Sequence, residues 1–116
     1  MLDLIIAIAI VIAGECGPIG NGCEIEIAKT MANRLVSGEF GDTAEEVLED
    51  YYGVGEVTPD AIRAAIIFVS MPEELSDGKY YFAYSNSDRY NMGWRKGDET
   101  ICGSGLCVNF SCDWPG

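Results

Sequence analysis

The chain has 116 residues, of which 48% are hydrophobic and 10% are aromatic. A chain of this length forms one domain with a real core, because folding buries roughly two thirds of its unfolded surface. The composition excludes a disordered or fibrous protein. The formal net charge of -12 produces a field that repels polyanions, so we expect no nucleic-acid partner. We predict a single domain over residues 1–116.

The cysteine and histidine counts limit which disulfides, metal sites and catalytic groups the chain can have. Five cysteines favour disulfides and an oxidising destination, with Cys102 pairing to either Cys107 or Cys112. A zinc site is the weaker alternative, because the chain has no histidine and no C-x-x-C pair. The absence of histidine also excludes Ser-His and Cys-His catalysis. We therefore expect carboxylate chemistry, with no metal and no cofactor.

The apolar segment over residues 2–14 predicts a helix that is buried on most of its faces, although its many isoleucines also suit a strand. Asp3 stands where a signal peptide carries positive charge, and the run is shorter than the roughly 20 residues of a membrane span. We expect neither. Several turn-forming residues follow within 14–22, so Glu15 should lie at the end of the helix, beside a loop.

Residues 23–37 place Ile27, Met31 and Leu35 on one stripe, which predicts an amphipathic helix. A capping box at residues 43–46 then predicts a short helix that ends near residue 52. A second cap with a following proline, at residues 58–59, predicts a helix through 61–69.

After residue 72 the sequence pattern changes from helical spacing to turn-forming and strand-forming residues. A turn at 76–78 precedes the aromatic segment 79–84, which predicts a strand, and residues 106–110 predict another. The fold class is therefore α+β, with N-terminal helices followed by a small β or loop region that disulfides hold in place.

Glu15 is the best-placed carboxyl group for catalysis. It follows the apolar helix directly, and burial there would keep it protonated, as a general acid requires. The alternative is that Glu15 caps the end of the helix in water. Asn33 is a candidate for ordering a carboxyl group or a sugar, while a structural hydrogen bond between helices is its common alternative role.

A group of aromatic and amide side chains is suited to stacking on sugar rings and hydrogen-bonding to them, although about half of these aromatics should belong to the core. The candidate substrate-binding residues of this group are Tyr81, Tyr84, Asn86, Tyr90 and Trp94, with Asn91 beside them.

Four segments resemble, in order and spacing, the SleB/CwlJ-type cell-wall hydrolases, which include spore-cortex-lytic enzymes and related phage proteins. They are Gly14-Glu15-Cys16, the loop at residues 20–22, Met31-Ala-Asn-Arg-Leu35 and Phe40-Gly-Asp-Thr43. Residues 81–86 and Trp94 match the family more loosely. The sequence departs from the family pattern in two ways. Ile19 stands where the family often has a second Glu, and the chain has no histidine, which the family commonly has in its final strand.

The resemblance implies a small lysozyme-like domain that cuts peptidoglycan between N-acetylmuramic acid and N-acetylglucosamine. Glu15 matches the catalytic Glu, and lytic transglycosylase chemistry needs no second carboxylate. Such a glycosidase acts outside the cell on the wall, and a phage endolysin would fit the missing export signal. Two alternatives remain: a non-catalytic glycan-binding or structural protein on the same scaffold, and a disulfide-rich inhibitor of a basic target.

Overall fold

The computed structural model describes residues 2–79, 81–86 and 99–112, without the side chains of residues 84–86. Within these residues five helices come first and a three-stranded antiparallel sheet follows, which confirms the α+β class. The elements are α1 Leu2–Cys16, α2 Cys23–Ser37, α3 Ala44–Leu48, α4 Pro59–Ser70, α5 Pro72–Leu75, β1 Tyr81–Asn86, β2 Glu99–Gly103 and β3 Leu106–Ser111.

The helix caps were predicted well, whereas several boundaries were not. The hydroxyl groups of Thr43 and Thr58 accept hydrogen bonds from the N–H groups three residues later, at 3.2 and 3.1 Å, and so begin α3 and α4. Helix α1 continues through Glu15 to Cys16, whereas α3 ends at Leu48, before the predicted boundary. The short helix α5 and the strand β2 were not predicted.

Helix α1 is the first segment of the core. Its residues Ile8, Ala9 and Ile12 are fully buried, while Leu2 at the start of the helix is 70% exposed. The strand alternative for this segment is thereby excluded. Among the described residues, no helix combines the length and the apolar character needed to cross a bilayer.

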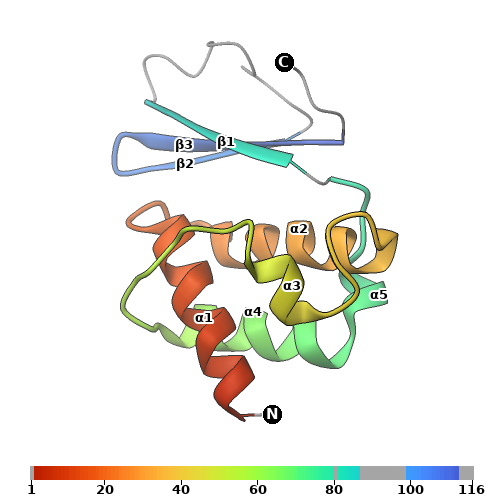
Figure 1. Cartoon of the computed structure of the whole chain (residues 1–116). Helices are drawn as coiled ribbons and strands as arrows, with labels where there is room; N and C mark the ends of the chain where they lie inside the picture. The colour runs from red at the N-terminus through yellow and green to blue at the C-terminus, as the bar shows by residue number, and fades with distance from the viewer. Residues whose placement is uncertain (1, 80, 87–98, 113–116) are drawn as a thin grey trace.

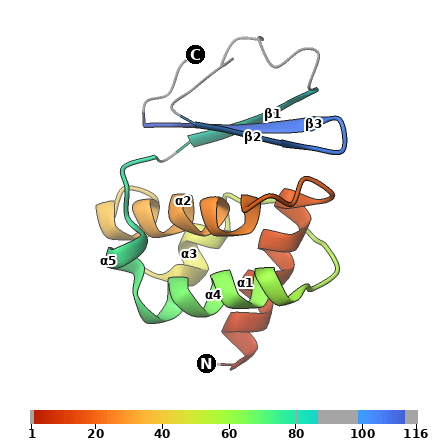
Figure 2. The same ribbon diagram turned by 180° about the vertical axis from the view of Figure 1, so that it is seen from behind.

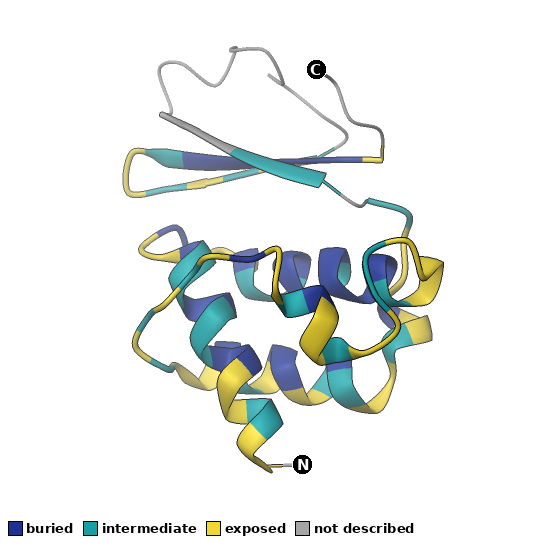
Figure 3. Cartoon of the chain, in the orientation of Figure 1, coloured by how far each residue is buried: buried dark blue, intermediate teal, exposed yellow. Residues whose placement is uncertain are grey.

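The molecule is layered, with α2 lying between the sheet and α4 (Figures 1 and 2). Most of α2 is buried as a result (Figure 3). One hydrophobic cluster joins the layers, because it includes Ile27 and Met31 of α2, Phe68 of α4 and Phe110 of β3. The C-terminal end of α1 lies toward the sheet, and the N-terminus lies at the opposite end of the molecule (Figure 1).

The sheet has the order β1-β3-β2, so β3 is the central strand. The face of the sheet that lies toward the helices packs on them through aromatic rings. Phe82 stacks on Tyr51 with ring centroids 5.6 Å apart, and Phe110 lies 6.3 Å from Phe82. These contacts fix the face of the sheet that covers α2.

Two disulfides are present, as the cysteine count predicted. Cys16–Cys23 joins the end of α1 to the start of α2, and Cys102–Cys107 joins β2 to β3 across their hairpin. The latter was one of the two alternatives for Cys102. Cys112 is exposed and belongs to neither bridge.

We predict that replacing both Cys16 and Cys23 by alanine lowers the free energy of unfolding. The bridge closes a short loop, with a sequence separation of 7, and loop-closure entropy gives about 2.5 kcal/mol for such a loop. Urea unfolding under oxidising conditions measures the change. A Cys112→Ala variant is the control and should unfold near the wild type. Equal midpoints for the double variant and the wild type would contradict the prediction.

Candidate functional site

Glu15 lies in the last turn of α1 and lines a cleft of about 370 Å³. The side chain is partly buried, between the exposed and the fully buried extremes. The other lining residues come from the end of α1, from the loop after it, from the segment after α3 and from the start of β3. They are Gly14, Cys16, Gly17, Pro18, Ile19, Tyr52, Gly53 and Leu106.

Two main-chain groups hold the carboxylate of Glu15. The N–H groups of Tyr52 and Gly53 donate to Oε2 at 3.0 and 2.9 Å. Hydrogen bonds to an ionised oxygen are stronger than neutral ones, and two donors on one atom restrict its position. Glu15 therefore has a fixed orientation relative to the segment that follows α3.

Three glycines make this approach possible. A Cβ atom on Gly53 would lie 2.5 Å from both the Glu15 nitrogen and the Val11 oxygen. A Cβ on Gly14 would overlap the main chain at Val54, and one on Gly55 would lie 2.6 Å from the Gly14 nitrogen. Side chains at these positions would force the segment away from α1 and remove its donors from Glu15.

The sheet reaches the cleft through Leu106, at the start of β3. Gly103 lies directly against the main chain of Ile19, again without room for a side chain. Asn21 Nδ2 donates to the Cys102 carbonyl at 2.7 Å, and Ser104 Oγ donates to the Pro18 carbonyl at 3.2 Å. The β2–β3 hairpin is thus attached to the loop between α1 and α2. Ile19, where the resembled family often has a second Glu, is 3% exposed and apolar.

Asn33 occupies a different place from the Glu15 cleft. It is 1% exposed, and its Nδ2 donates to Asp77 Oδ1 and to the Lys79 carbonyl, both at 2.7 Å. Its Oδ1 accepts from the N–H groups of Asp77 and Gly78 at 2.6 and 2.9 Å. These four bonds use the full capacity of an amide and attach Asn33 to the segment after α5, whereas the alternative expected a partner on another helix. Burial acts to raise the pKa of Asp77, but hydrogen bonds from Lys79 and Asn33 outweigh it and hold that pKa below its usual range.

Tyr81 contributes to the contact between the layers. Its ring meets Phe40 edge-to-face at 6.2 Å and lies 6.0 Å from the Arg34 guanidinium. The same guanidinium lies 4.6 Å from the Phe40 ring and 5.0 Å from the Tyr51 ring. This geometry is that of cation–π packing between α2 and the sheet, and Tyr81 is not among the residues that line the Glu15 cleft.

The remaining predicted substrate-binding residues are placed only in part. Tyr84 and Asn86 belong to strand β1, of which the structure describes the main chain at these positions. Tyr90, Asn91 and Trp94 lie outside the described residues. Their role in sugar binding stays a prediction.

Tyr51 anchors the segment that reaches Glu15. Its ring is 6% exposed, and its hydroxyl group shares a 2.8 Å hydrogen bond with Thr30. Burial raises the pKa of Tyr51 to about 12, against the lowering effect of the nearby Arg34. Tyr51 is therefore an uncharged core residue, although its neighbour Tyr52 is 88% exposed.

The sequence did not identify Tyr52 and Gly53 as site residues. Their contribution to Glu15 comes from main-chain N–H groups, which every residue except proline has. The one signal was the Gly53-Val-Gly55 run, which allows close approach but does not say to what.

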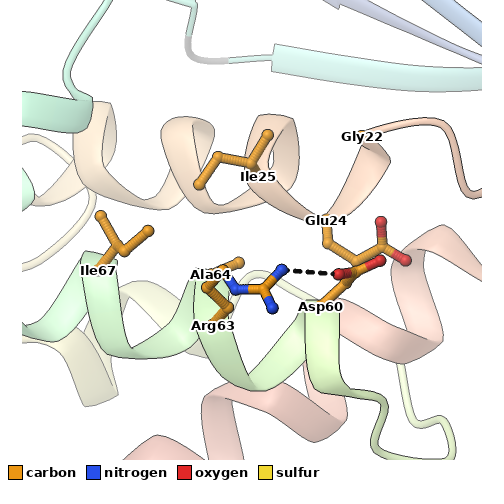
Figure 4. A pocket seen from close by; sticks show the side chains of 7 residues that line it. All are labelled: Gly22, Glu24, Ile25, Asp60, Arg63, Ala64 and Ile67. Carbon is orange, nitrogen blue, oxygen red and sulfur yellow. Dashed lines mark hydrogen bonds and ion pairs between the residues drawn. The ribbon is translucent and has the colours of Figure 1, made fainter.

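A second pocket, of about 310 Å³, lies between α2 and α4 (Figure 4). Ile25 and Ile67 face it from the two helices, and Arg63 pairs with Asp60 at 3.0 Å. Both members of this ion pair are about two-thirds exposed, at 69% and 68%, so water sets their environment. Of the carboxyl groups that line these two pockets, that of Glu15 is oriented by main-chain donors, and we place the candidate site there.

Comparisons of the chain with known protein families, with curated proteins and with solved structures find no match. The Glu15 cleft is therefore interpreted from its own residues and from the chemistry that they allow.

We predict that Gly53→Ala lowers the free energy of unfolding by on the order of 2 kcal/mol, because the new methyl group overlaps the last turn of α1. Urea unfolding followed by circular dichroism measures the loss. Val54→Ala is the matched control, since Val54 is 84% exposed and should change stability by less than about 0.5 kcal/mol. A Gly53→Ala protein as stable as the wild type would show that the segment does not need this close contact.

We also predict a loss of stability at high pH through Tyr51. Its pKa is near 10 in the unfolded chain and about 12 in the folded one, so the unfolded state loses the proton first as the pH rises. The contribution is complete below pH 10 and is lost toward pH 12, by roughly 1–2 kcal/mol between pH 9 and pH 11. Urea midpoints at the two pH values, compared with those of Tyr51→Phe, measure it. An equal decline in the variant would exclude Tyr51 as the cause.

Proposed function

We propose that the protein cleaves the glycan strand of peptidoglycan between N-acetylmuramic acid and N-acetylglucosamine. The observation that carries the proposal is the Glu15 carboxyl group, which two main-chain N–H groups orient beside a cleft. The resemblance of residues 6–43 to the SleB/CwlJ-type hydrolases supports it, since Glu15 matches their catalytic Glu. The activity is that of a glycosidase on a lysozyme-like domain.

The proposed chemistry is that of a lytic transglycosylase. Glu15 protonates the oxygen that links the two sugars, and the bond from this oxygen to C1 of the muramoyl sugar breaks. The carboxylate then accepts the proton of the muramoyl C6 hydroxyl group as that oxygen bonds to C1. The products are a 1,6-anhydro sugar and a free 4-hydroxyl group, and the enzyme regains its proton.

This route needs one acid, and the cleft supplies one. Among the described residues that line it, Glu15 is the only carboxyl group. The neighbouring position Ile19 is apolar and nearly fully buried, so it offers nothing that activates water. The N–H donors on Oε2 stabilise the negative charge that Glu15 carries after its first proton transfer. The single carboxyl group and the apolar Ile19 are the features that favour ring closure by the sugar over attack by water.

The two disulfides suit a protein that acts in an oxidising place, such as the outside of a cell. We therefore place the activity at the cell wall, with peptidoglycan strands as the partner. A phage-encoded wall-lytic enzyme fits this location.

A second candidate is a non-catalytic glycan-binding or structural protein. The hydrogen bonds at Glu15 favour it as well, because they give the carboxylate a structural task. By accepting from Tyr52 and Gly53, Glu15 holds the segment after α3 against α1. A catalytic and a structural Glu15 differ in what happens when the proton is removed and the shape is kept.

We predict that Glu15→Gln stops the release of soluble muropeptides and leaves the fold intact. The amide oxygen of Gln still accepts from both N–H groups, but the side chain no longer transfers a proton. General acid–base catalysis contributes roughly 10²–10⁴-fold, so the rate should fall by that factor. Mass spectrometry of products from purified peptidoglycan measures release and identifies 1,6-anhydro ends. Glu56→Gln is the control, since Glu56 is exposed and does not line the cleft.

Other results have distinct meanings. Reducing-end products that disappear in the Glu15→Gln protein would indicate hydrolysis by the same residue. Equal release by the wild type and by Glu15→Gln would remove Glu15 from the chemistry. No release by the oxidised wild type from several kinds of wall would reject the enzyme and favour the binding or structural protein.

A further inference from the structure

We infer that the side chain of Tyr52 is a stacking platform for an N-acetylhexosamine ring at the edge of the Glu15 cleft. The inference rests on the proposed function and adds a sugar-binding residue that the sequence patterns did not indicate. It starts from one juxtaposition: the residue whose N–H orients the candidate catalytic carboxylate also lines the cleft and has an exposed aromatic ring.

Tyr52 is far more exposed than the tyrosine that precedes it in the chain. Its side chain is 88% exposed, while the preceding Tyr51 is 6% exposed and packs in the core. An isolated exposed apolar residue on a surface needs no explanation. Tyr52 differs because it belongs to the lining of a cleft and lies beside its carboxyl group.

The main chain holds Tyr52 in place on both sides. Tyr51 is buried and bonded to Thr30, and Gly53 lies in close contact with α1. The Tyr52 N–H is itself bonded to Glu15 at 3.0 Å. A tyrosine side chain has two rotatable χ angles, so a ring on such a fixed main chain loses little entropy when a ligand covers it.

The surroundings select the class of ligand. A pyranose ring has a C–H face, which packs on the face of an aromatic ring, and its polar groups point outward. Pro18 and Leu106 add apolar surface to the cleft, suited to the methyl group of an N-acetyl substituent. The net charge of -12 opposes anionic polysaccharides and leaves neutral N-acetylated sugars favoured.

The experiment measures binding separately from cleavage. The probe is the neutral tetramer of N-acetylglucosamine, titrated into the Glu15→Gln protein and followed by NMR. Adding Tyr52→Ala should weaken binding about tenfold, which corresponds to about 1.4 kcal/mol. Adding Tyr52→Phe should keep the affinity within about twofold, because the ring remains. Each variant keeps the N–H at position 52, and Val54→Ala controls for an exposed apolar neighbour on the same segment.

Unchanged affinity in the Tyr52→Ala protein would overturn the inference, as would an equal loss in the Val54→Ala protein or the absence of binding by the parent. Thermal unfolding of each variant checks that the fold is kept. Product release by the wild type separates the two proposals. Glu15-dependent cleavage without a Tyr52 effect on binding would retain the proposed function and reject the platform. Tyr52-dependent binding without cleavage would retain the platform on a non-catalytic glycan-binding protein.

Discussion

The contact between residues 53–55 and the end of α1 is the constraint on which the Glu15 site depends. Gly14, Gly53 and Gly55 bring two main chains so close that no Cβ atom fits between them. Glycines make an unfolded chain more flexible and therefore oppose folding. The burial of Tyr51 and its hydrogen bond to Thr30 offset that effect next to the contact. The carboxylate position thus depends on a packing arrangement larger than the cleft.

Hydrogen bonds and a close main-chain contact also join the sheet to the helices. At one end, Asn33 accepts from and donates to the turn before β1. At the other end, Gly103 lies against Ile19, and side chains of the two loops bond to opposing carbonyl groups. Arg34 and its aromatic neighbours fill the space between the layers. Because both ends are attached, Leu106 of the sheet lines the cleft together with residues of α1 and the loops.

The sequence predicted those parts of the fold that local patterns control. Periodic apolar positions identified α2, and the caps at Thr43 and Thr58 identified the starts of α3 and α4. Strand β2 was not found, because Glu99–Gly103 has little apolar alternation and gains its order from pairing with β3. The early end of α3 has a similar cause, since the chain must leave the helix to reach α1.

Of the candidate site, only Glu15 could be predicted from the sequence. Glu15 was found from its position after an apolar segment, and the structure places it at a cleft. Its hydrogen-bond donors were not, because they lie 37 and 38 residues away and belong to the main chain. Asn33 illustrates the opposite case, in which an amide on a helix suits a ligand or a turn equally well. Only the tertiary arrangement, with the turn at Asp77 within reach, decides between them.

The main chain and the side chain of residue 52 have separate roles, and this separation affects which sequence changes the protein tolerates. Its main chain serves the carboxylate, and its side chain points to solvent without a role in the core. Any residue other than proline keeps the N–H donor. Position 52 is therefore free to vary in size, charge or aromaticity while the acid keeps its orientation. The surface at this position can change by single substitutions, whereas the position of the carboxylate depends on the glycines.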